Sequence, residues 1–250
     1  HIYDTVALSM NATPQKIIDL VSERQAGADG AMAKLIEDTV FGTVPSTTDT
    51  QTPLGLFYYL VGGAQGFNGL VPTGADSVAY TTVAGINPTT YPRFANWADV
   101  YVNVDKPDLV YKMRLAYIKC QFIAPMTVPS EGNGNDFAIL SNSNVILPFE
   151  DALDAQNDNL GQDLAKYAGQ TTFRRTPIQY VPVLDDNAVY TDPVFGINWG
   201  KMWFAILKGW DMNEAPPHVV SNQHTVQAVD KDLVWGLKCL DRRAHWLITK

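Results

Sequence analysis

The sequence predicts an α+β fold, and three features carry that prediction. Residues 14–41 have the apolar spacing of one long helix. The second half of the chain holds several short runs rich in β-branched and aromatic residues, which are typical of strands. Segments rich in glycine and proline separate these elements. With 250 residues, the chain can form one large domain or two modest ones.

The bulk composition excludes some classes of protein. A hydrophobic content of 46% is that of an ordinary globular protein. The 18 basic and 26 acidic residues leave a net charge of −8, which argues against tight wrapping of nucleic acid. No apolar run approaches the ~20 residues of a membrane span, and no signal peptide is visible. The chain opens at His1 without an initiator methionine, so we expect a processed or truncated product.

The first predicted element is the helix over residues 14–41. Thr13 is a suitable N-cap, and Pro14 suits the first helical position. This helix should be the longest in the chain. Its apolar positions, which we expect to face a sheet, are Ile17, Val21, Met32 and Leu35, with Ala28 between them.

Two irregular regions follow the long helix. Residues 42–83 mix an apolar run with glycine-rich turns, so any strands there should be short. Residues 84–97, "AGINPTTYPRFANW", have neither helical period nor strand alternation. Their aromatic side chains Tyr91, Phe94 and Trp97 can bury a large area, either in the core or against a neighbouring molecule.

The middle of the chain predicts two further helices. Residues 106–123 form the first, capped by Asp105 or Asp108, and its apolar face holds Val110, Met113, Tyr117 and Cys120. Residues 145–159 form the second, in which Pro148 is tolerable only in the first turn. Between them lie a polar loop, 131–136, and a buried strand, 137–142.

The last third of the chain reads as strands. Three runs are rich in β-branched and aromatic residues, at 176–184, 194–199 and 202–207. Residues 228–249 close the chain as paired strands.

A search for catalytic and metal-binding motifs finds none. The chain has no G-x-S-x-G, no HExxH and no pair of CxxC motifs, and "GINWGK" lacks the spacing of a phosphate loop. His1, His218, His224 and His245 are scattered without metal-ligand spacing. Asp151, Asp154 and Asp158 read as a solvated helix face rather than a calcium site. We therefore predict no cofactor, no metal and no enzymatic activity.

The cysteines and the arginine pairs suggest little chemistry. Cys120 and Cys239 lie in apolar surroundings and read as small buried hydrophobes, although a disulfide is possible. The pairs 174–175 and 242–243 read as surface charges, which could meet acidic groups on another subunit or loosely touch phosphate.

The order of elements resembles the major capsid proteins of tailed bacteriophages, whose fold is shared with encapsulins. The carrying segments are the long helix, "TPLGL", "AGINPTTYPRFANW", the helix–strand–helix region around "FAILSN", "TTFRRTPIQYVPVLDD" and "VFGINWGKMWFAIL". The family often has a G-I-x-R-x-x-Y-P-x-W segment. Here Pro88 stands where arginine is common and Phe94 where tryptophan is common.

The resemblance implies a domain arrangement. A peripheral domain would comprise 1–102 and 209–250, with the long helix and a sheet, and an inserted axial domain, 103–208, would hold a central sheet flanked by helices. The N-terminal arm and most of the extended loop that precede the long helix in this family would be absent from this chain. On that basis we also expect the isolated chain to be largely monomeric.

The resemblance also implies a function. The chain would be a shell subunit that self-assembles through hexamers and pentamers of identical copies into an icosahedral viral capsid. It would enclose DNA that it contacts only weakly, and scaffold or portal proteins would be candidate partners. It would have no membrane partner, and it would reside in the virion after assembly in the host cytoplasm.

Subunit contacts should concentrate on two polar loops, 129–136 and 184–193. The second loop, "LDDNAVYTDP", is turn-rich and lies between strands, so we expect it to protrude. Deletion of 186–191 should leave the fold intact and impair ring formation. The candidate interface residues in and near these loops are Asn133, Asn135, Asp185, Asp186, Tyr190, Arg174 and Arg175.

Three alternatives stay open. An encapsulin-type compartment shell would package enzyme cargo instead of a genome. A soluble α+β hydrolase or binding protein would place loops 62–76 and 129–136 around a pocket, but no convergent acids and histidines support it. A phage tail or neck component would also self-associate.

Overall fold

The computed structural model describes residues 2–5, 14–72, 80–120, 137–154, 171–174, 176–187 and 189–250. The chain divides into two compact units. Unit 1 comprises residues 1–38 and 204–236, and unit 2 comprises residues 39–203 and 237–250. The boundaries of these compact units therefore differ from the boundaries predicted for the peripheral and axial domains. The assignment of those two domains stays a prediction.

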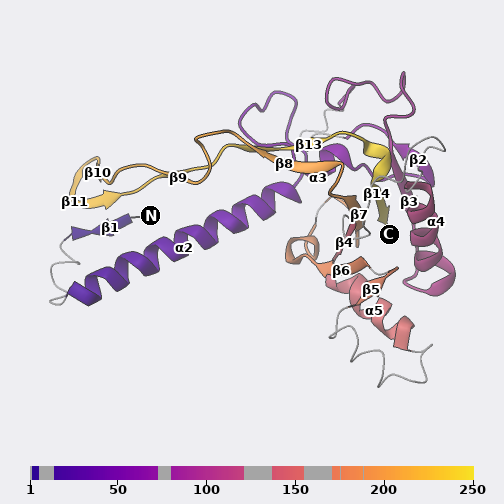
Figure 1. The fold of residues 1–250 in the computed structure, drawn as a ribbon, viewed down its shortest axis with the longest axis horizontal. Helices are drawn as coiled ribbons and strands as arrows, with labels where there is room; N and C mark the ends of the chain where they lie inside the picture. The colour runs from indigo at the N-terminus through magenta and orange to yellow at the C-terminus, as the bar shows by residue number, and fades with distance from the viewer. Residues whose placement is uncertain are drawn as a thin grey trace. The chain divides into compact units, whose positions relative to one another are not determined.

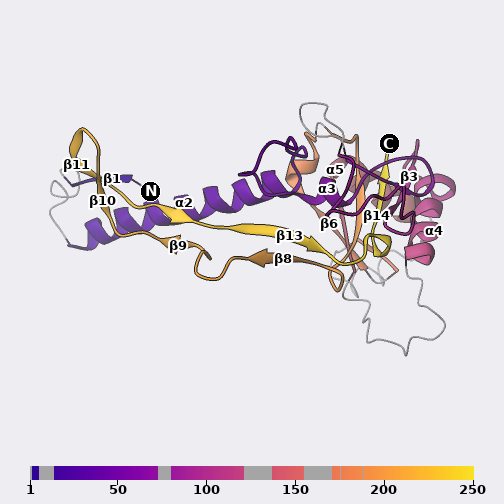
Figure 2. The ribbon, with the colours of Figure 1, turned by 90° about the horizontal axis from the view of Figure 1, so that it is seen from above.

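Unit 1 combines the long helix with narrow antiparallel ribbons (Figures 1 and 2). The helix is α2 (Pro14–Val40), the longest in the described part of the chain, as predicted. A three-stranded sheet has the order β1 (Ile2–Asp4), β11 (Gln223–Ala228) and β10 (His218–Val220). Further along, β9 (Asn213–Glu214) pairs with β12 (Lys231–Asp232). Lys231 forms an ion pair with Asp29 and so links β12 to α2.

The predicted apolar face of α2 is only partly buried. Val21 and Met32 are half-buried, but 61% of Leu35 is exposed, so the expectation that Leu35 faces a sheet is wrong. The strands of unit 1 form ribbons only two or three strands wide, which provide little surface to cover a long helix. The predicted cap Thr13 lies outside the described residues, and so does the side chain of Ile17.

One two-stranded sheet starts in unit 2 and continues into unit 1. It pairs β8 (Met202–Ile206) with β13 (Trp235–Cys239). Both strands lie in segments predicted as strands, 202–207 and 228–249.

Unit 2 is built on a seven-stranded mixed sheet. Its strands in spatial order are β2 (Gly66–Gly69), β3 (Asn96–Val100), β14 (Trp246–Thr249), β7 (Val194–Asn198), β4 (Phe137–Ser141), β6 (Thr176–Tyr180) and β5 (Thr172–Phe173). The pairs β3–β14 and β4–β6 are parallel, and the other pairs are antiparallel. Because β14 pairs with β7, the sheet joins strands from both of the predicted domains.

The core of unit 2 contains the predicted second helix. A π-helical turn (Lys106–Val110) leads into α4 (Tyr111–Cys120), and the Asp105 carboxylate caps it by accepting from the Asp108 amide at 2.9 Å. The predicted face is confirmed, with Val110, Met113 and Cys120 buried and Tyr117 partly buried in the same cluster.

The centre of the sheet depends on a glycine. Gly196 of β7 lies opposite Trp246 of β14, and a Cβ at position 196 would be 1.9 Å from the indole Cε2. The indole therefore occupies the space above a residue without a side chain, and this close approach explains a glycine in the middle of a buried strand.

Helices α3 and α5 also belong to unit 2. The short helix α3 (Leu56–Tyr59) lies in the region predicted to be irregular. Helix α5 (Ser143–Asp154) begins earlier than predicted, which puts Pro148 in the second turn rather than the first. The Asn142 side chain accepts from the Val145 amide at 3.2 Å, and this cap favours the earlier start. The predicted end at 159 lies outside the described residues.

The aromatic segment 84–97 contributes to the core of its own subunit only in part. Trp97 is buried and belongs to β3, Phe94 is half-buried, and Tyr91 is 63% exposed. The thiols of Cys120, which is buried, and of Cys239 are both free. Among the described residues, no helix has both the length and the apolar character needed to cross a membrane.

Candidate assembly surface

The loop 184–193, expected to protrude, is anchored at its start. The Asp185 carboxylate accepts from the amide and the hydroxyl of Ser143, both at 2.9 Å, and from the Tyr180 hydroxyl. The hydrogen bond from Tyr180 is the largest influence that lowers the pKa of Asp185 below its ordinary value. Asp185 therefore fixes the N-terminus of α5 within its own subunit.

The end of the same loop packs into unit 2. The Tyr190 hydroxyl accepts from the Gly62 amide at 2.9 Å, and its ring lies 5.4 Å from that of Phe57. The Asn187 side-chain amide donates to the Phe41 carbonyl at 2.9 Å. Deleting 186–191 would remove these contacts, so we now expect that deletion to destabilise the fold rather than to leave it intact.

The other candidate interface residues are not brought together. Asp186 is exposed. Arg174 has a positive φ of 48°, and its guanidinium lies 5.1 Å from the centre of the Tyr117 ring. Asn133, Asn135 and Arg175 lie outside the described residues. The placement of subunit contacts at these residues stays a prediction.

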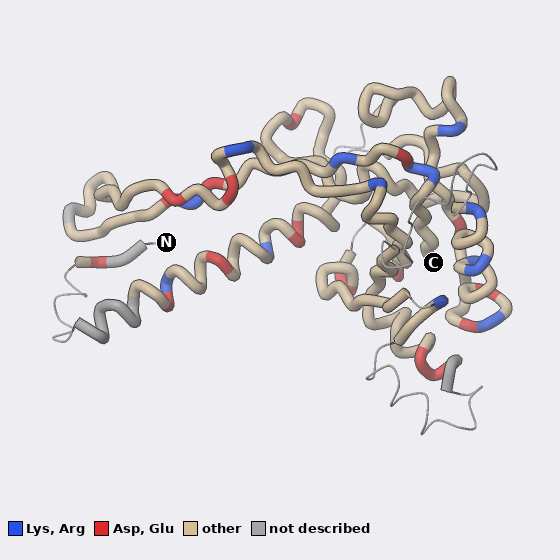
Figure 3. The backbone as a smooth tube through the Cα atoms, viewed as in Figure 1, with Lys and Arg blue, Asp and Glu red and all other residues tan. Residues whose placement is uncertain are grey.

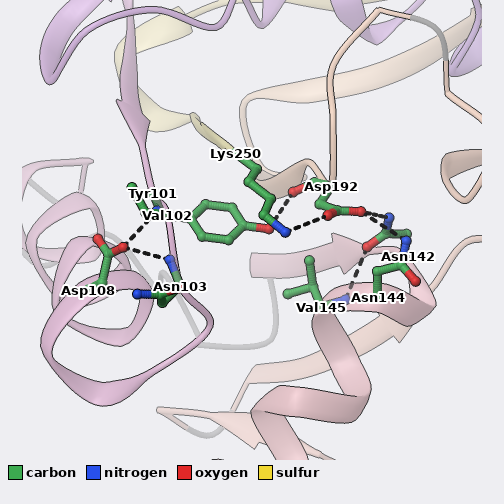
Figure 4. Close-up of polar contacts among 9 residues, drawn as sticks. All are labelled: Tyr101, Val102, Asn103, Asp108, Asn142, Asn144, Val145, Asp192 and Lys250. Carbon is green, nitrogen blue, oxygen red and sulfur yellow. Dashed lines mark hydrogen bonds and ion pairs between the residues drawn. The ribbon is translucent and has the colours of Figure 1, made fainter.

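A polar network joins Asp192 to the start of α5 and to Lys250, the residue that follows β14 (Figure 4). The Asp192 carboxylate accepts from the side-chain amides of Asn142 at 2.8 Å and Asn144 at 3.1 Å, and the Lys250 ammonium lies 3.6 Å away. Burial raises the pKa of Asp192, but these three groups outweigh it and the net shift is downward. The Tyr101 hydroxyl donates to the Asp192 carbonyl at 2.9 Å. The donors and acceptors satisfy one another, which is the pattern of a structural support.

Arg242 corrects the prediction that the pair 242–243 consists of surface charges. Its side chain is fully buried, and its guanidinium donates five hydrogen bonds. The acceptors are the carbonyls of Tyr59, Gly69, Leu70 and Phe94 and the side-chain oxygen of Asn96, at 2.7–3.2 Å. Burial lowers the pKa of Arg242 to about 10, so the group still carries its charge at neutral pH. Its neighbour Arg243 lies over the Phe67 ring, 3.6 Å from the ring centre.

Arg242 thus ties together loops that lie far apart in sequence. The carbonyl acceptors come from the ends of α3 and β2 and from the aromatic segment just before β3. The sequence around Arg242 does not reveal that this side chain is buried and links the loops. An Arg-Arg pair next to a turn is typical of side chains that are exposed to solvent.

The histidines in the described part of the chain are possible metal ligands, and their surroundings test that role. No group of three or more His, Cys, Asp or Glu side chains among them could hold a metal ion. His218 is exposed and lies 3.8 Å from Asp230. His245 is buried, its Nδ1 accepts from the Asn198 amide at 3.1 Å, and burial lowers its pKa to about 3. His1 and the side chain of His224 are not among the described groups.

Several large apolar side chains of unit 1 are exposed. We call this surface the apolar ribbon and define it by six residues that are each 40–54% exposed: Phe204, Ile206, Leu207, Trp210, Met212 and Val234. The Leu207 amide donates to the Val234 carbonyl at 3.0 Å, and the Val234 amide donates to the Trp210 carbonyl at 3.1 Å. These bonds hold the two edges of the ribbon together and place Leu207 and Trp210 close to Val234.

Such a surface indicates a binding partner. Exposed apolar patches of this kind on proteins mark interaction sites, and aromatic residues and methionine are enriched in interfaces. The prediction of a strand at 202–207 is confirmed, but sequence reasoning missed the exposure because a continuous apolar run is typical of a buried strand.

Comparisons with known proteins find similarity in structure and none in sequence. No family model matches the chain, and no curated protein sequence matches it. A chain of the cyanophage A-1(L) capsid asymmetric unit is similar with a TM-score of 0.64 and 15% sequence identity, over 100% of this chain and 75% of that chain. The chain has the fold of a phage major capsid protein. A structure from Gordonia phage Cozz is also similar, with a TM-score of 0.49 and 13% identity, over 100% of this chain and 67% of that one.

The capsid-type fold agrees with the element order on which the resemblance was based. The long helix α2, the mixed sheet of unit 2 and the closing strand β14 all belong to the similar region, since the likeness covers the whole chain. An α+β class with a long helix and a large sheet is therefore confirmed.

Proposed function

We propose that the chain is a structural subunit of an icosahedral viral capsid, and that its function resides in contacts between identical copies. The observation that carries the proposal is the capsid-type fold over the whole chain, with a TM-score of 0.64 to a protein from a cyanophage capsid. Fold by itself does not specify function, so the exposed surfaces of the chain carry the rest of the argument.

The apolar ribbon supports this proposal. A monomeric protein gains nothing from six exposed large apolar side chains on one ribbon, whereas a shell subunit buries such side chains on assembly. The absence of a catalytic motif from the sequence also favours a structural role over the hydrolase alternative.

The role as a capsid subunit also implies how the copies assemble, which partners they have and where assembly takes place. Identical copies form hexamers and pentamers that close into a shell, and scaffold and portal proteins are further partners. The shell encloses DNA and contacts it weakly, because a net charge of −8 does not favour binding to phosphate. Assembly takes place in the host cytoplasm, and the product is the virion capsid.

Electron microscopy of the full-length protein tests the proposal. We expect closed shells of uniform size after expression or after transfer to assembly conditions. Shells that contain enzyme cargo and no genome would instead indicate a compartment. A protein that stays monomeric under every assembly condition, or that binds a cofactor in a pocket, would overturn the shell function.

A further inference from the structure

The two units differ in charge. Unit 1 contains ten acidic and five basic residues, a net charge of −5 in a part that is less than half the size of the other unit. In unit 2, the segment from Lys106 to Cys120, which forms the π-helical turn and α4, has four basic residues and one acidic residue. Basic side chains accordingly recur along α4 in Figure 3, in a chain that is acidic overall.

The outer face of α4 combines these charges with apolar side chains. Tyr111 and Ile118 are 57% and 59% exposed, and Arg114 lies between them, so that the three residues share one helix face. Lys119 is exposed beside them. Lys112 is already engaged, because its ammonium binds the Asp108 carboxylate and the Val100 carbonyl. We call Tyr111, Arg114, Ile118 and Lys119 the α4 stripe.

The apolar ribbon of unit 1 carries two exposed acids and one exposed cation, Lys208, so its net charge is negative. Asp211 follows Trp210 directly, and Asp232 lies opposite Asn213 at the point where β9 pairs with β12. Both carboxylates are exposed. Because Trp210 and Val234 are joined by a backbone hydrogen bond, the two acids flank the same exposed apolar pair.

We propose that the α4 stripe of one copy binds the apolar ribbon of a second copy of this chain. In each surface an apolar centre is bordered by charges, and the net charges are of opposite sign, because the ribbon has Asp211 and Asp232 against Lys208 alone. Because the two surfaces differ, the contact is heterologous, and contacts of this type generate rings when the rotation between copies closes. The inference rests on the proposed shell function and identifies two of the surfaces through which it would act.

A protein surface fits the α4 stripe better than DNA does. Binding to the phosphate backbone rewards basic residues and does not require large apolar side chains between them. Protein interfaces combine an apolar centre with a polar rim, which is the arrangement of Tyr111 and Ile118 beside Arg114 and Lys119. Opposite charge across the interface would also select this pairing over contacts between two ribbons or two stripes.

Reversing the charges tests the contact in the full-length protein. A stripe variant carries Arg114→Glu and Lys119→Glu, and a ribbon variant carries Asp211→Lys and Asp232→Lys. Sedimentation should show that each variant alone associates about tenfold more weakly than the wild type, or worse, because like charges then face each other. An equimolar mixture of the two should recover association, since each reversed surface finds an opposite charge on the other variant.

Two matched variants control for charge reversal as such. Arg93→Glu and Asp151→Lys change exposed residues outside both surfaces and should leave association at the wild-type level. Circular dichroism melting checks that each variant folds. If a reversed variant does not fold, the neutral changes Arg114→Gln and Asp232→Asn replace it, and each should weaken association.

The outcomes separate this inference from the proposed function. Single variants that associate like the wild type, or a mixture that does not recover, overturn the contact while the shell function stands. Wild-type protein that does not assemble at all overturns the shell function itself. DNA binding that the stripe variant loses, with association unchanged, would assign the α4 stripe to nucleic acid and overturn the protein contact.

Discussion

β7 and β8 follow one another along the chain and are both rich in apolar residues, but β7 is mostly buried and β8 is mostly exposed. The residues of β7, "VFGIN", are buried from Val194 to Ile197, whereas in β8, "MWFAI", only Met202 is buried. β7 lies inside the seven-stranded sheet between β14 and β4, while β8 has β13 as its one partner in a two-stranded sheet. Hydrophobicity makes both segments strands, but burial depends on what covers them. The exposed strand is where we expect a second subunit to bind.

The largest expected change in stability comes from replacing a phenylalanine in β7, and the matching replacement in β8 should have a much smaller effect. Phe195 is fully buried and its ring lies 5.5 Å from that of Phe57, so Phe195→Ala should lower the free energy of unfolding by about 3–5 kcal/mol. Phe204→Ala, at a residue that is 43% exposed, should cost less than about 1 kcal/mol and should weaken assembly instead. Chemical denaturation and sedimentation measure the two effects. Equal losses of stability would mean that the strands do not differ in burial.

The second prediction compares the adjacent arginines. Arg242→Ala should destabilise unit 2 by roughly 3 kcal/mol, because its removal leaves four buried or partly buried carbonyls and the Asn96 side chain without their donor. Arg243→Ala removes a stacking contact with Phe67 and should cost about 0.5–1 kcal/mol. Thermal melting with a stability curve for each variant gives both values. A smaller loss for Arg242 than for Arg243 would contradict the supporting role of the buried guanidinium.

The third prediction concerns the pH dependence of the buried sheet. Burial, with a smaller effect of the Arg242 charge, lowers the pKa of His245 from 6.5 to about 3 in the folded state. Below pH 6.5 the unfolded chain therefore binds the proton first, and the folded state loses stability as the pH falls. This group alone should remove about 2 kcal/mol between pH 7 and pH 5.

Comparison with a His245→Gln variant isolates the contribution of that histidine. The unfolding free energy of the variant should change less between pH 7 and pH 5 than that of the wild type, because glutamine does not titrate. If the unfolding free energies of the two proteins changed equally with pH, His245 would not be held neutral by burial in the folded protein. Shell assembly at the exposed strand β8 should not depend on this substitution.

The smallest expected loss of stability is at an exposed apolar residue. Leu35→Ala in α2 should cost less than about 1 kcal/mol, because 61% of the side chain is already in water. Met113→Ala in α4, at a residue that is 1% exposed, is the matched control and should cost about 2–5 kcal/mol. A loss of 2 kcal/mol or more at Leu35 would mean that another surface covers it in solution.

Local periodicity was sufficient for much of the fold. The apolar spacing located α2 and the buried face of α4, and the β-branched runs located β4, β6, β7 and β8. Element order then indicated the capsid-type fold that the structural comparison supports. These properties depend on residues a few positions apart, so the chain itself specifies them.

Side-chain environment required the tertiary structure. Arg242 is buried because carbonyls from three distant loops converge on it, and Tyr190 is anchored because Gly62 lies beside it. Leu35 and Phe204 are exposed because unit 1, to which both belong, offers only narrow ribbons to cover them. A sequence pattern specifies which face of an element is apolar, but only the packing of distant segments decides whether that face meets the core, the solvent or another copy of the chain.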